Sequence, residues 1–210
     1  MADGPRRRVL IVEDDLTMLT LLSAVCEAGG HEPVTATDGV EALEAASTGA
    51  CDLVLLDMNL PGMSGLEVCR RMRRDGRREP IIVVTASTDT VDAVVALEVG
   101  ADDYVRKPFH ARELAARIAR HLRRREPQTP GNGVRRMEFP GLVIDPIRRQ
   151  VWRDGAEVRL TITEFNLLHT LAERPKAVVT RRELMQRIWN QDAADSRTID
   201  AHIYRLRRKV

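Results

Sequence analysis

Aromatic side chains, cysteines and long apolar runs are all scarce in this sequence of 210 residues. Phe, Trp and Tyr make up 3% of the chain, so its cores must be built mainly from Val, Leu, Ile and Ala. Three cysteines occur, Cys26, Cys51 and Cys69, without CxxC spacing, and we interpret them as reduced thiols of a cytoplasmic protein. No apolar run reaches the length of a membrane span. The short run near the start ends in three acids, which excludes a signal peptide.

Charge is unevenly distributed along the chain. Residues 1–126 hold 17 Lys+Arg against 21 Asp+Glu, a balance of −4, whereas residues 127–210 hold 16 against 10, a balance of +6. An acidic half joined to a basic half indicates two different tasks, with a polyanion as the candidate partner of the basic half.

The first half alternates between short apolar runs and segments of helical periodicity. Continuous apolar runs are typical of strands that are buried on both faces of a parallel sheet. Five strand–helix repeats predict a five-stranded, doubly wound α/β domain over residues 1–124. The expected strands are 9–12, 33–36, 53–56, 81–84 and 103–105, and the clearest helices are 16–27, 65–73, 91–98 and 111–124.

Pro and Gly then interrupt the pattern, which predicts a linker over residues 125–136. Beyond it, residues 137–160 alternate in polarity between tight-turn sequences, which is typical of short antiparallel strands. Three helices should follow. Thr161–Glu164 and Thr180–Glu183 both match the capping box that starts a helix, and the third helix should start near Asp195 or Ser196. Residues 137–210 are therefore predicted to form an α+β domain.

Polar residues follow the predicted parallel strands at the points where these end. Parallel topology brings such residues to one edge of the sheet, where ligands bind in doubly wound folds. Crowded carboxylates repel one another unless a cation joins them, and oxygen ligands without His or Cys suit Mg²⁺. The residues concerned are Glu13, Asp14, Asp15, Asp57, Thr85 and Lys107.

Four separated motifs in residues 7–124 together resemble the receiver domain of response regulators. They are "VLIVEDD", "DLVLLDMNLPGMSGLEV", "PIIVVTA" and "GADDYVRKPF". The resemblance implies a flavodoxin-like strand order and makes Asp57 the acceptor of a phosphoryl group from a sensor histidine kinase. It further implies that Glu13, Asp14, Asp57 and the backbone carbonyl of Asn59 hold Mg²⁺, with Lys107 and Thr85 contacting the phosphoryl oxygens. Tyr104 would then turn inward, and the Lys107–Pro108 bond should be cis.

An aspartyl-phosphate hydrolase is the rival interpretation of this pocket. Its Asp-x-Asp motif uses the second acid as a general acid, but Asn59 stands at that place in this chain. The change argues against a turnover enzyme. Asp15 is expected to be a helix cap or an outer acid and not a ligand.

The same resemblance implies a homodimer on phosphorylation, formed by helix four, strand five and helix five. Candidate ion pairs join Asp102 and Asp103 to Arg117 and Arg124, and Glu113 is a further family position. Val95 stands where its basic partner is usual.

The last helix is apolar on one side and cationic over the rest. Ile199, Ile203, Leu206 and Val210 fall on one stripe at about 100° per residue. Three short helices with a basic last one suit a helix-turn-helix relative, whose last helix enters the major groove of DNA.

The segments 160–189 and 197–210 resemble the winged-helix effector domain of OmpR/PhoB-type transcription factors. The resemblance implies binding to double-stranded promoter DNA, with a loop at 189–195 that touches RNA polymerase or is a plain connector. The expected DNA contacts are Arg197, His202, Arg205, Arg207 and Arg208.

Together the two resemblances imply a phosphorylation-dependent transcription regulator of a two-component system, with receiver, linker and winged helix. A receiver with a protein-docking effector domain is the alternative. Relatives continue past Val210 with a hairpin, the wing, so we expect a truncated chain with an unpaired strand at Val178–Val179.

Overall fold

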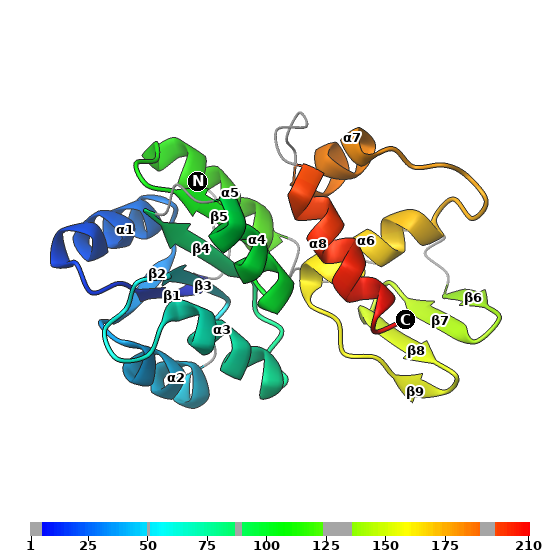
Figure 1. Ribbon diagram of the computed structural model, residues 1–210, viewed down its shortest axis with the longest axis horizontal. Helices are drawn as coiled ribbons and strands as arrows, with labels where there is room; N and C mark the ends of the chain where they lie inside the picture. Colours follow the sequence, from blue (N-terminus) through cyan, green and yellow to red (C-terminus); the bar gives the residue numbers. More distant parts are fainter. Residues whose placement is uncertain (1–5, 50, 87–89, 124–135, 190–195) are drawn as a thin grey trace. The chain divides into compact units, whose positions relative to one another are not determined.

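The computed structural model describes residues 6–49, 51–86, 90–123, 136–189 and 196–210. The chain divides into two compact units, Met1–Arg123 and Arg124–Val210 (Figure 1). The predicted linker, apart from Arg136, lies outside the described residues. No helix in the described ranges is long and apolar enough to cross a membrane.

The first unit is a parallel five-stranded sheet of order β2-β1-β3-β4-β5, as the sequence predicts. Helices alternate with the strands along the chain (Figure 1). The strands are β1 (Arg8–Val12), β2 (Glu32–Ala36), β3 (Leu53–Asp57), β4 (Ile81–Thr85) and β5 (Asp103–Arg106). The helices are α1 (Leu16–Ala28), α2 (Gly39–Thr48), α3 (Gly65–Arg74), α4 (Thr90–Val99) and α5 (Ala111–Arg123).

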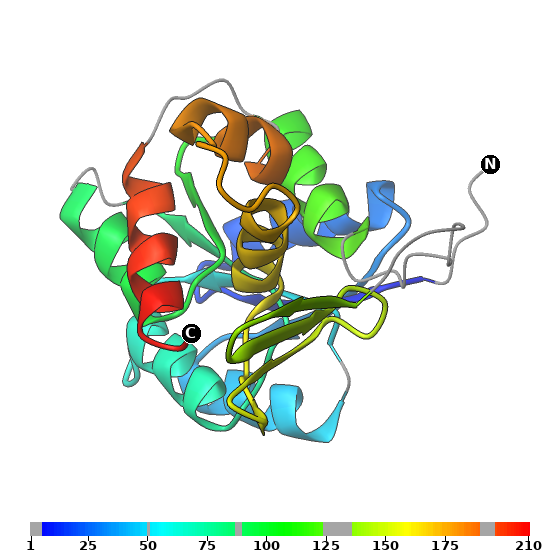
Figure 2. The ribbon, with the colours of Figure 1, turned by 90° about the vertical axis from the view of Figure 1, so that its right-hand side faces the viewer.

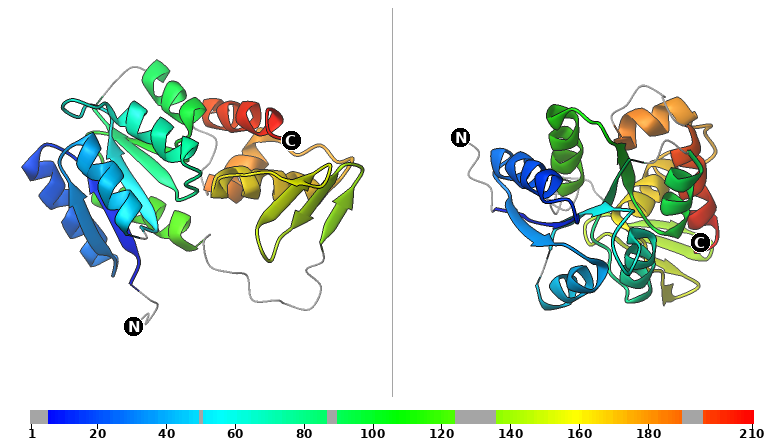
Figure 3. Two further views of the ribbon diagram at one scale, coloured as in Figure 1. Left: turned by 90° about the horizontal axis from the view of Figure 1, so that it is seen from below. Right: turned by 60° about the vertical axis from the view of Figure 1, so that its left-hand side comes forward.

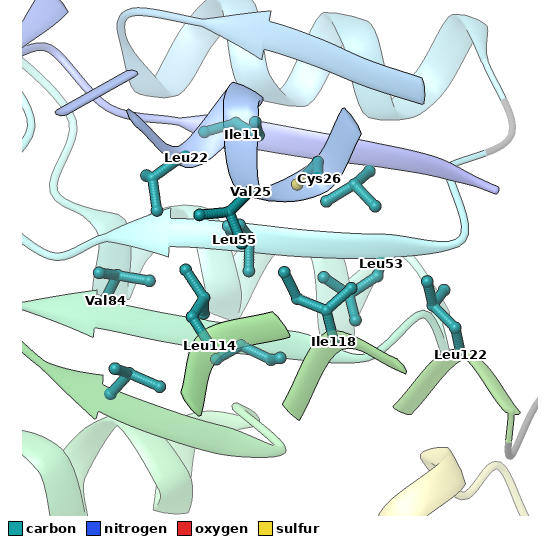
Figure 4. Close-up of a cluster of buried hydrophobic side chains, with 13 residues drawn as sticks. Ile11, Leu22, Val25, Cys26, Leu53, Leu55, Val84, Leu114, Ile118 and Leu122 are labelled. Carbon is teal, nitrogen blue, oxygen red and sulfur yellow. The ribbon is translucent and has the colours of Figure 1, made fainter. Parts of the chain in front are cut away.

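Aliphatic side chains build the core of this unit. Every residue of β3 and β4 is buried, which explains their continuous apolar runs. Figure 4 shows side chains of α1 and α5, among them Leu22, Leu114 and Ile118, packed against Leu55 and Val84 of the sheet. Within the described residues, this cluster contains no aromatic side chain apart from Phe109 at its margin.

Short polar side chains begin the helices that follow the sheet strands. Asp15 accepts hydrogen bonds from the backbone N–H groups of Thr17 and Met18 at the start of α1. Asp38 and Ser64 cap α2 and α3 in the same manner.

The second unit combines an antiparallel sheet of order β6-β7-β8-β9 with three helical segments. Figures 2 and 3 show α6 next to this sheet, and Phe165 and Leu168 of α6 share one core with Ile144 and Val151 of the strands. The strands are β6 (Met137–Phe139), β7 (Leu142–Asp145), β8 (Gln150–Arg153) and β9 (Ala156–Glu157). The helices are α6 (Ile162–Ala172), α7 (Arg181–Leu184), which continues as a π-helical turn (Met185–Trp189), and α8 (Ser196–Arg207).

The two predicted capping boxes of the second unit differ in the hydrogen bonds they form. At α6 the box is reciprocal, since Thr161 accepts from the Glu164 N–H and Glu164 accepts from the Thr161 N–H. At α7 the Glu183 N–H donates to Thr180, whereas the Glu183 carboxylate pairs with Arg174 and Arg187.

The segment Val178–Val179, expected to be an unpaired strand, pairs with no strand of the described residues. These residues adopt no regular secondary structure, and Val178 is 92% exposed. β-branched side chains favour a strand only where a neighbouring strand supplies the hydrogen bonds, and no strand of the described residues pairs with them.

Candidate functional site

The carboxyl edge of the parallel sheet gathers the polar residues that the sequence singles out. Asp57 ends β3 and Thr85 ends β4, and the register pairs Asp57 with Val84, so the two positions are neighbours across the strands. Glu13 follows β1 on the other side of β3. Glu13 and Asp57 are 2% and 5% exposed, whereas Asp14 is exposed. One buried edge thus presents two carboxylates with a third at its rim.

The three carboxylates lie close enough to share one ion. Oxygen atoms of Glu13, Asp14 and Asp57 all lie within 4.8 Å of one another. Burial raises the pKa of Glu13, and the charges of Asp57 and Asp14 add to the rise, while Lys107 opposes it. Within the described residues Asp57 Oδ1 is buried and makes no hydrogen bond. An all-oxygen set with an unsatisfied buried oxygen fits Mg²⁺.

Lys107 brings the opposite charge to the carboxylates. Its Nζ atom donates to Glu13 Oε2 at 2.7 Å and lies 3.4 Å from Asp57 Oδ1. Its backbone N–H donates to the Thr85 carbonyl at 2.8 Å, which places the residue directly beyond β5. The predicted cis bond between Lys107 and Pro108 is confirmed. The pocket therefore has a cation facing its central aspartate.

Gly65 allows α3 to start directly against the end of β3. A Cβ atom at Gly65 would lie 2.0 Å from the Asp57 carbonyl oxygen. The Gly65 N–H donates to the Met58 carbonyl at 3.1 Å, which closes the turn between strand and helix. The backbone at Asp57 and Met58 is thus held by a close approach of Gly65 that a side chain would prevent.

Three other residues that the sequence predicts for the pocket are Asp15, Asn59 and Tyr104. Asp15 is the helix cap that the sequence suggested, and its two backbone hydrogen bonds lower its pKa. Asn59 is exposed in the turn after β3. Tyr104 is half-buried on β5, with the guanidinium carbon of Arg106 6.0 Å from its ring centre.

On β5 and α5, Asp103 is the centre of a charged cluster. Its carboxylate accepts two hydrogen bonds from Arg117, at 2.9 and 3.0 Å, and pairs with Arg120. His121 Nε2 lies 3.4 Å from the same carboxylate. Burial by itself would raise the pKa of Asp103, but the hydrogen bond with His121 and the charges of Arg117 and Arg120 hold it well below its usual range. The expected Asp103–Arg117 pair therefore exists within a single chain.

Asp102 contacts another part of the unit, and its expected pairing with Arg117 stays a prediction. It is fully buried and accepts from Arg73 of α3 at 2.8 Å and from the Ile81 N–H at 3.1 Å. Arg73 also donates to the Gly100 carbonyl at 2.9 Å. Asp102 directly precedes β5 and Asp103 begins it, and the two carboxylates contact different helices, α3 and α5.

The remaining residues of the expected dimer face are placed in part. Glu113 pairs with Arg117 at 2.8 Å, one turn along α5, and Val95 is half-buried on α4. Arg124 lies outside the described residues. Sequence reasoning missed Arg73, Arg120 and His121. Arg73 lies 29 residues from Asp102, and no local pattern signals such a pair.

The last helix, α8, separates its cations into two groups. Arg207 and Arg208 are exposed, and with Asp200 and the 53% exposed Tyr204 they share one face of the helix. Arg205 Nη2 instead lies 2.7 Å from Glu164 Oε1 of α6.

His202 and Arg197 are the two other residues of α8 that the sequence predicts as DNA contacts. The His202 ring centre lies 5.3 Å from that of Trp189. The side chain of Arg197 lies outside the described residues. Whether these residues contact DNA stays a prediction.

Two family models cover most of the chain. Residues 9–119 match the response regulator receiver domain, and residues 155–210 match the C-terminal domain of transcriptional regulatory proteins. The first match includes the whole acidic pocket, and the second includes α6, α7 and α8.

Curated relatives match over nearly their full length. The DNA-binding response regulator MtrA of Mycobacterium tuberculosis is 41% identical over 209 residues, which are 99% of this chain and 90% of the relative. The alkaline phosphatase synthesis transcriptional regulatory protein PhoP of Bacillus subtilis is 38% identical over 211 residues, covering 97% and 88%.

Solved structures agree in fold. A mutant of RitR has a TM-score of 0.76 and 25% identity, covering 97% of this chain and 90% of the other. DrrB of Thermotoga maritima, an OmpR/PhoB homologue, has a TM-score of 0.54 and 31% identity, covering 98% and 89%.

Proposed function

The chain belongs to the OmpR/PhoB-type response regulators, which regulate transcription in two-component systems, and we propose that Asp57 is its phosphoacceptor. One observation carries the proposal. Asp57 is the carboxylate that lies within 4.8 Å of two other acids and 3.4 Å from a lysine, and its Oδ1 makes no hydrogen bond within the described residues.

Glu13, Asp14 and Asp57, with the backbone carbonyl of Asn59, would hold Mg²⁺ in this pocket. When bound, the ion would neutralise charge on the phosphoryl oxygens. The proposal rests on the donor set, since all of these ligands are oxygens and none is His or Cys.

The phosphoryl group would come from a phosphohistidine of a sensor histidine kinase. An Asp57 carboxylate oxygen would attack phosphorus, so that a P–O bond forms as the P–N bond breaks and the imidazole nitrogen leaves with the electron pair. Lys107 would stabilise the phosphoryl oxygens, since its ammonium already faces both buried acids. This makes the chain a phosphoacceptor and not a turnover enzyme.

The signal would leave the pocket through Thr85 and Tyr104. The Thr85 hydroxyl would donate to a phosphoryl oxygen, because Thr85 sits on the strand next to Asp57. Tyr104, on the strand beyond, would turn inward with it. We propose that the face with Glu113, Asp103 and Arg117 then forms a homodimer in the cytoplasm.

The effector unit would place α8 in the major groove of promoter DNA. Arg207 ends α8 and Arg208 follows it, and both are exposed, which suits contacts to phosphates. Arg205 is proposed to read a base edge, where Arg pairs best with guanine. Arg197 and His202 are proposed as further contacts, and residues 189–195 as the contact to RNA polymerase.

Labelling of the full chain by acetyl phosphate and Mg²⁺ tests the pocket. We expect Asp57→Asn to abolish the incorporation of phosphate that alkali and hydroxylamine release, because the amide cannot form the acyl phosphate. Asp75→Asn, an exposed acid after α3, is the matched control and should label as the wild type does. Undiminished labelling of Asp57→Asn would contradict the assignment.

Selection of bound duplexes from a random pool tests the effector unit. We expect the phosphorylated chain to enrich a defined sequence, and we expect its binding to weaken steeply with salt. Enrichment of no sequence, with weak salt dependence, would favour a protein-docking domain instead.

A further inference from the structure

Glu164 has no place in the proposed chemistry, yet it is a fully buried carboxylate. It lies in the first turn of α6 and contacts Arg205 of α8. The two helices pack against each other within the second unit (Figure 2). A buried charge is costly unless cations and hydrogen bonds compensate it. The groups that contact Glu164 therefore explain how the protein tolerates a buried carboxylate at this position.

The Glu164 carboxylate contacts one backbone N–H and two cations. Oε2 accepts from Lys209 Nζ at 2.7 Å and from the Thr161 N–H at 2.8 Å. Oε1 lies 2.7 Å from Arg205 Nη2. One side chain thus caps α6 and contacts one cation in the last turn of α8, Arg205, and one just beyond its end, Lys209.

The electrostatics of the cluster favour the ionised carboxylate. Burial by itself raises the pKa of Glu164, but Arg205 and Lys209 outweigh it and the pKa is lowered. Arg205 and Lys209 are one helical turn apart, so a single acid reaches both. Arg207 and Arg208 project from the exposed face instead.

We propose that Glu164 is a positioning residue for DNA recognition, which fixes the Arg205 guanidinium and withholds Arg205 and Lys209 from indiscriminate attraction to phosphates. This inference rests on the proposed contact between Arg205 and DNA. Specificity is a difference between two affinities. By orienting Arg205, the carboxylate would raise the affinity for the specific sequence. By partly neutralising Arg205 and Lys209, it would lower the affinity for other sequences.

Glu164→Gln in the full, phosphorylated chain tests the inference. Gln keeps the capping box and nearly the same volume but removes the charge. The probes are the duplex selected by the wild type and a shuffled duplex of equal composition. We expect the affinity ratio between them to fall about tenfold. For the shuffled duplex, the slope of log K against log salt should steepen by about 1 to 2, because two cations are released.

Glu183→Gln is the matched control. Glu183 occupies the same capping position in α7 and pairs with Arg174 and Arg187, neither of which is on α8. The variant changes net charge by the same amount and should leave the affinity ratio within about twofold. An equal fall in both variants would overturn the inference, since net charge would then explain it.

Arg205→Lys separates failure of the inference from failure of the proposed function. It keeps the charge but loses the planar fork that reads guanine. If Arg205→Lys lowers the ratio and Glu164→Gln does not, Arg205 reads DNA without help from Glu164 and the inference is wrong. If Arg205→Lys leaves the ratio unchanged, the DNA contact itself is wrong. We expect the double variant to show no further loss beyond Arg205→Lys.

Glu164→Asp is the second test variant, for use if the thermal transition of Glu164→Gln shows that this variant does not fold. Asp retains the charge but is one methylene shorter, so it cannot hold the same contacts with α8. We expect a partial fall in the affinity ratio with little change in salt slope. An unchanged ratio in a folded Glu164→Asp chain would overturn the inference.

Discussion

Lys107 and Glu13 are 94 residues apart in the chain, yet Lys107 Nζ donates to Glu13 Oε2 at 2.7 Å. The pair joins the loop after the last strand of the sheet to the loop after the first. The same ammonium lies 3.4 Å from Asp57, on the strand between them. It therefore compensates two buried carboxylates that would otherwise repel each other.

Lys107→Met should slow phosphorylation without removing the acceptor. A preorganised cation that stabilises developing charge typically contributes about 100-fold to the rate. We expect labelling by acetyl phosphate and Mg²⁺ to slow by roughly that factor. Arg106→Gln is the matched control, since Arg106 is exposed on the neighbouring position. Equal rates for Lys107→Met and the wild type would remove Lys107 from the mechanism.

Asp102→Ala should destabilise the receiver unit strongly. It would leave the Arg73 guanidinium, whose side chain is 11% exposed, without its carboxylate. Breaking such a buried pair costs about 3 kcal/mol of unfolding free energy or more. Urea unfolding followed by circular dichroism measures it. Asp75→Asn serves as the control and should change stability by about 0.5 kcal/mol or less; an Asp102→Ala value in that range would contradict the buried pair.

Gly65→Ala should disturb the pocket by displacing the backbone next to Asp57. The new Cβ atom would meet the Asp57 carbonyl oxygen at 2.0 Å, so α3 must move away from β3. Overpacking of this kind costs about 1–3 kcal/mol. We expect a lower urea midpoint and slower labelling of Asp57. Gly29→Ala, whose Cβ would first meet the His31 ring at 3.1 Å, should leave labelling unchanged.

The stability of the effector unit should fall in acid because of Glu164. Its pKa in the folded chain is lower than the ordinary 4.5. The ionised group therefore stabilises the fold fully above about pH 4.5, and this contribution is lost as the pH falls through the folded value. Fluorescence of the buried Trp189 reports unfolding. Glu164→Gln should make the acid dependence flatter; an unchanged profile would show that other carboxylates dominate.

Arg207→Ala and Arg208→Ala should each weaken DNA binding uniformly across sequences. A lost phosphate contact reduces the slope of log K against log salt by about 1. Titrations of the selected and the shuffled duplex at several salt concentrations measure it. Arg148→Ala, exposed in the turn between β7 and β8, is the control. A change in the affinity ratio between the duplexes would instead assign these arginines to base contacts.

Much of the receiver unit could be predicted from local patterns. The apolar runs give the strands, and their burial on both faces gives a parallel sheet. The parallel topology of that sheet is enough to place Glu13, Asp57 and Thr85 at one edge. The capping sequence at Thr161 likewise predicts the start of α6.

The partners of the charged residues could not be predicted in this way. Asp102 and Asp103 are adjacent and alike in sequence, yet one pairs with Arg73 of α3 and the other with Arg117 and Arg120 of α5. Arg205 reads as one of several basic residues on a helix, although it lies against a buried acid of another helix.

The sequence by itself determined the elements, the acid pocket and the cationic character of α8, because hydrophobic period and strand-end chemistry are local properties. Only the tertiary structure decided which cation meets which acid. Such pairs depend on strand alternation and helix rotation, which bring together residues 29 and 41 positions apart, as in Arg73–Asp102 and Glu164–Arg205. Burial then makes the choice energetically decisive, since an unpaired charge inside the protein is far more costly than one in water.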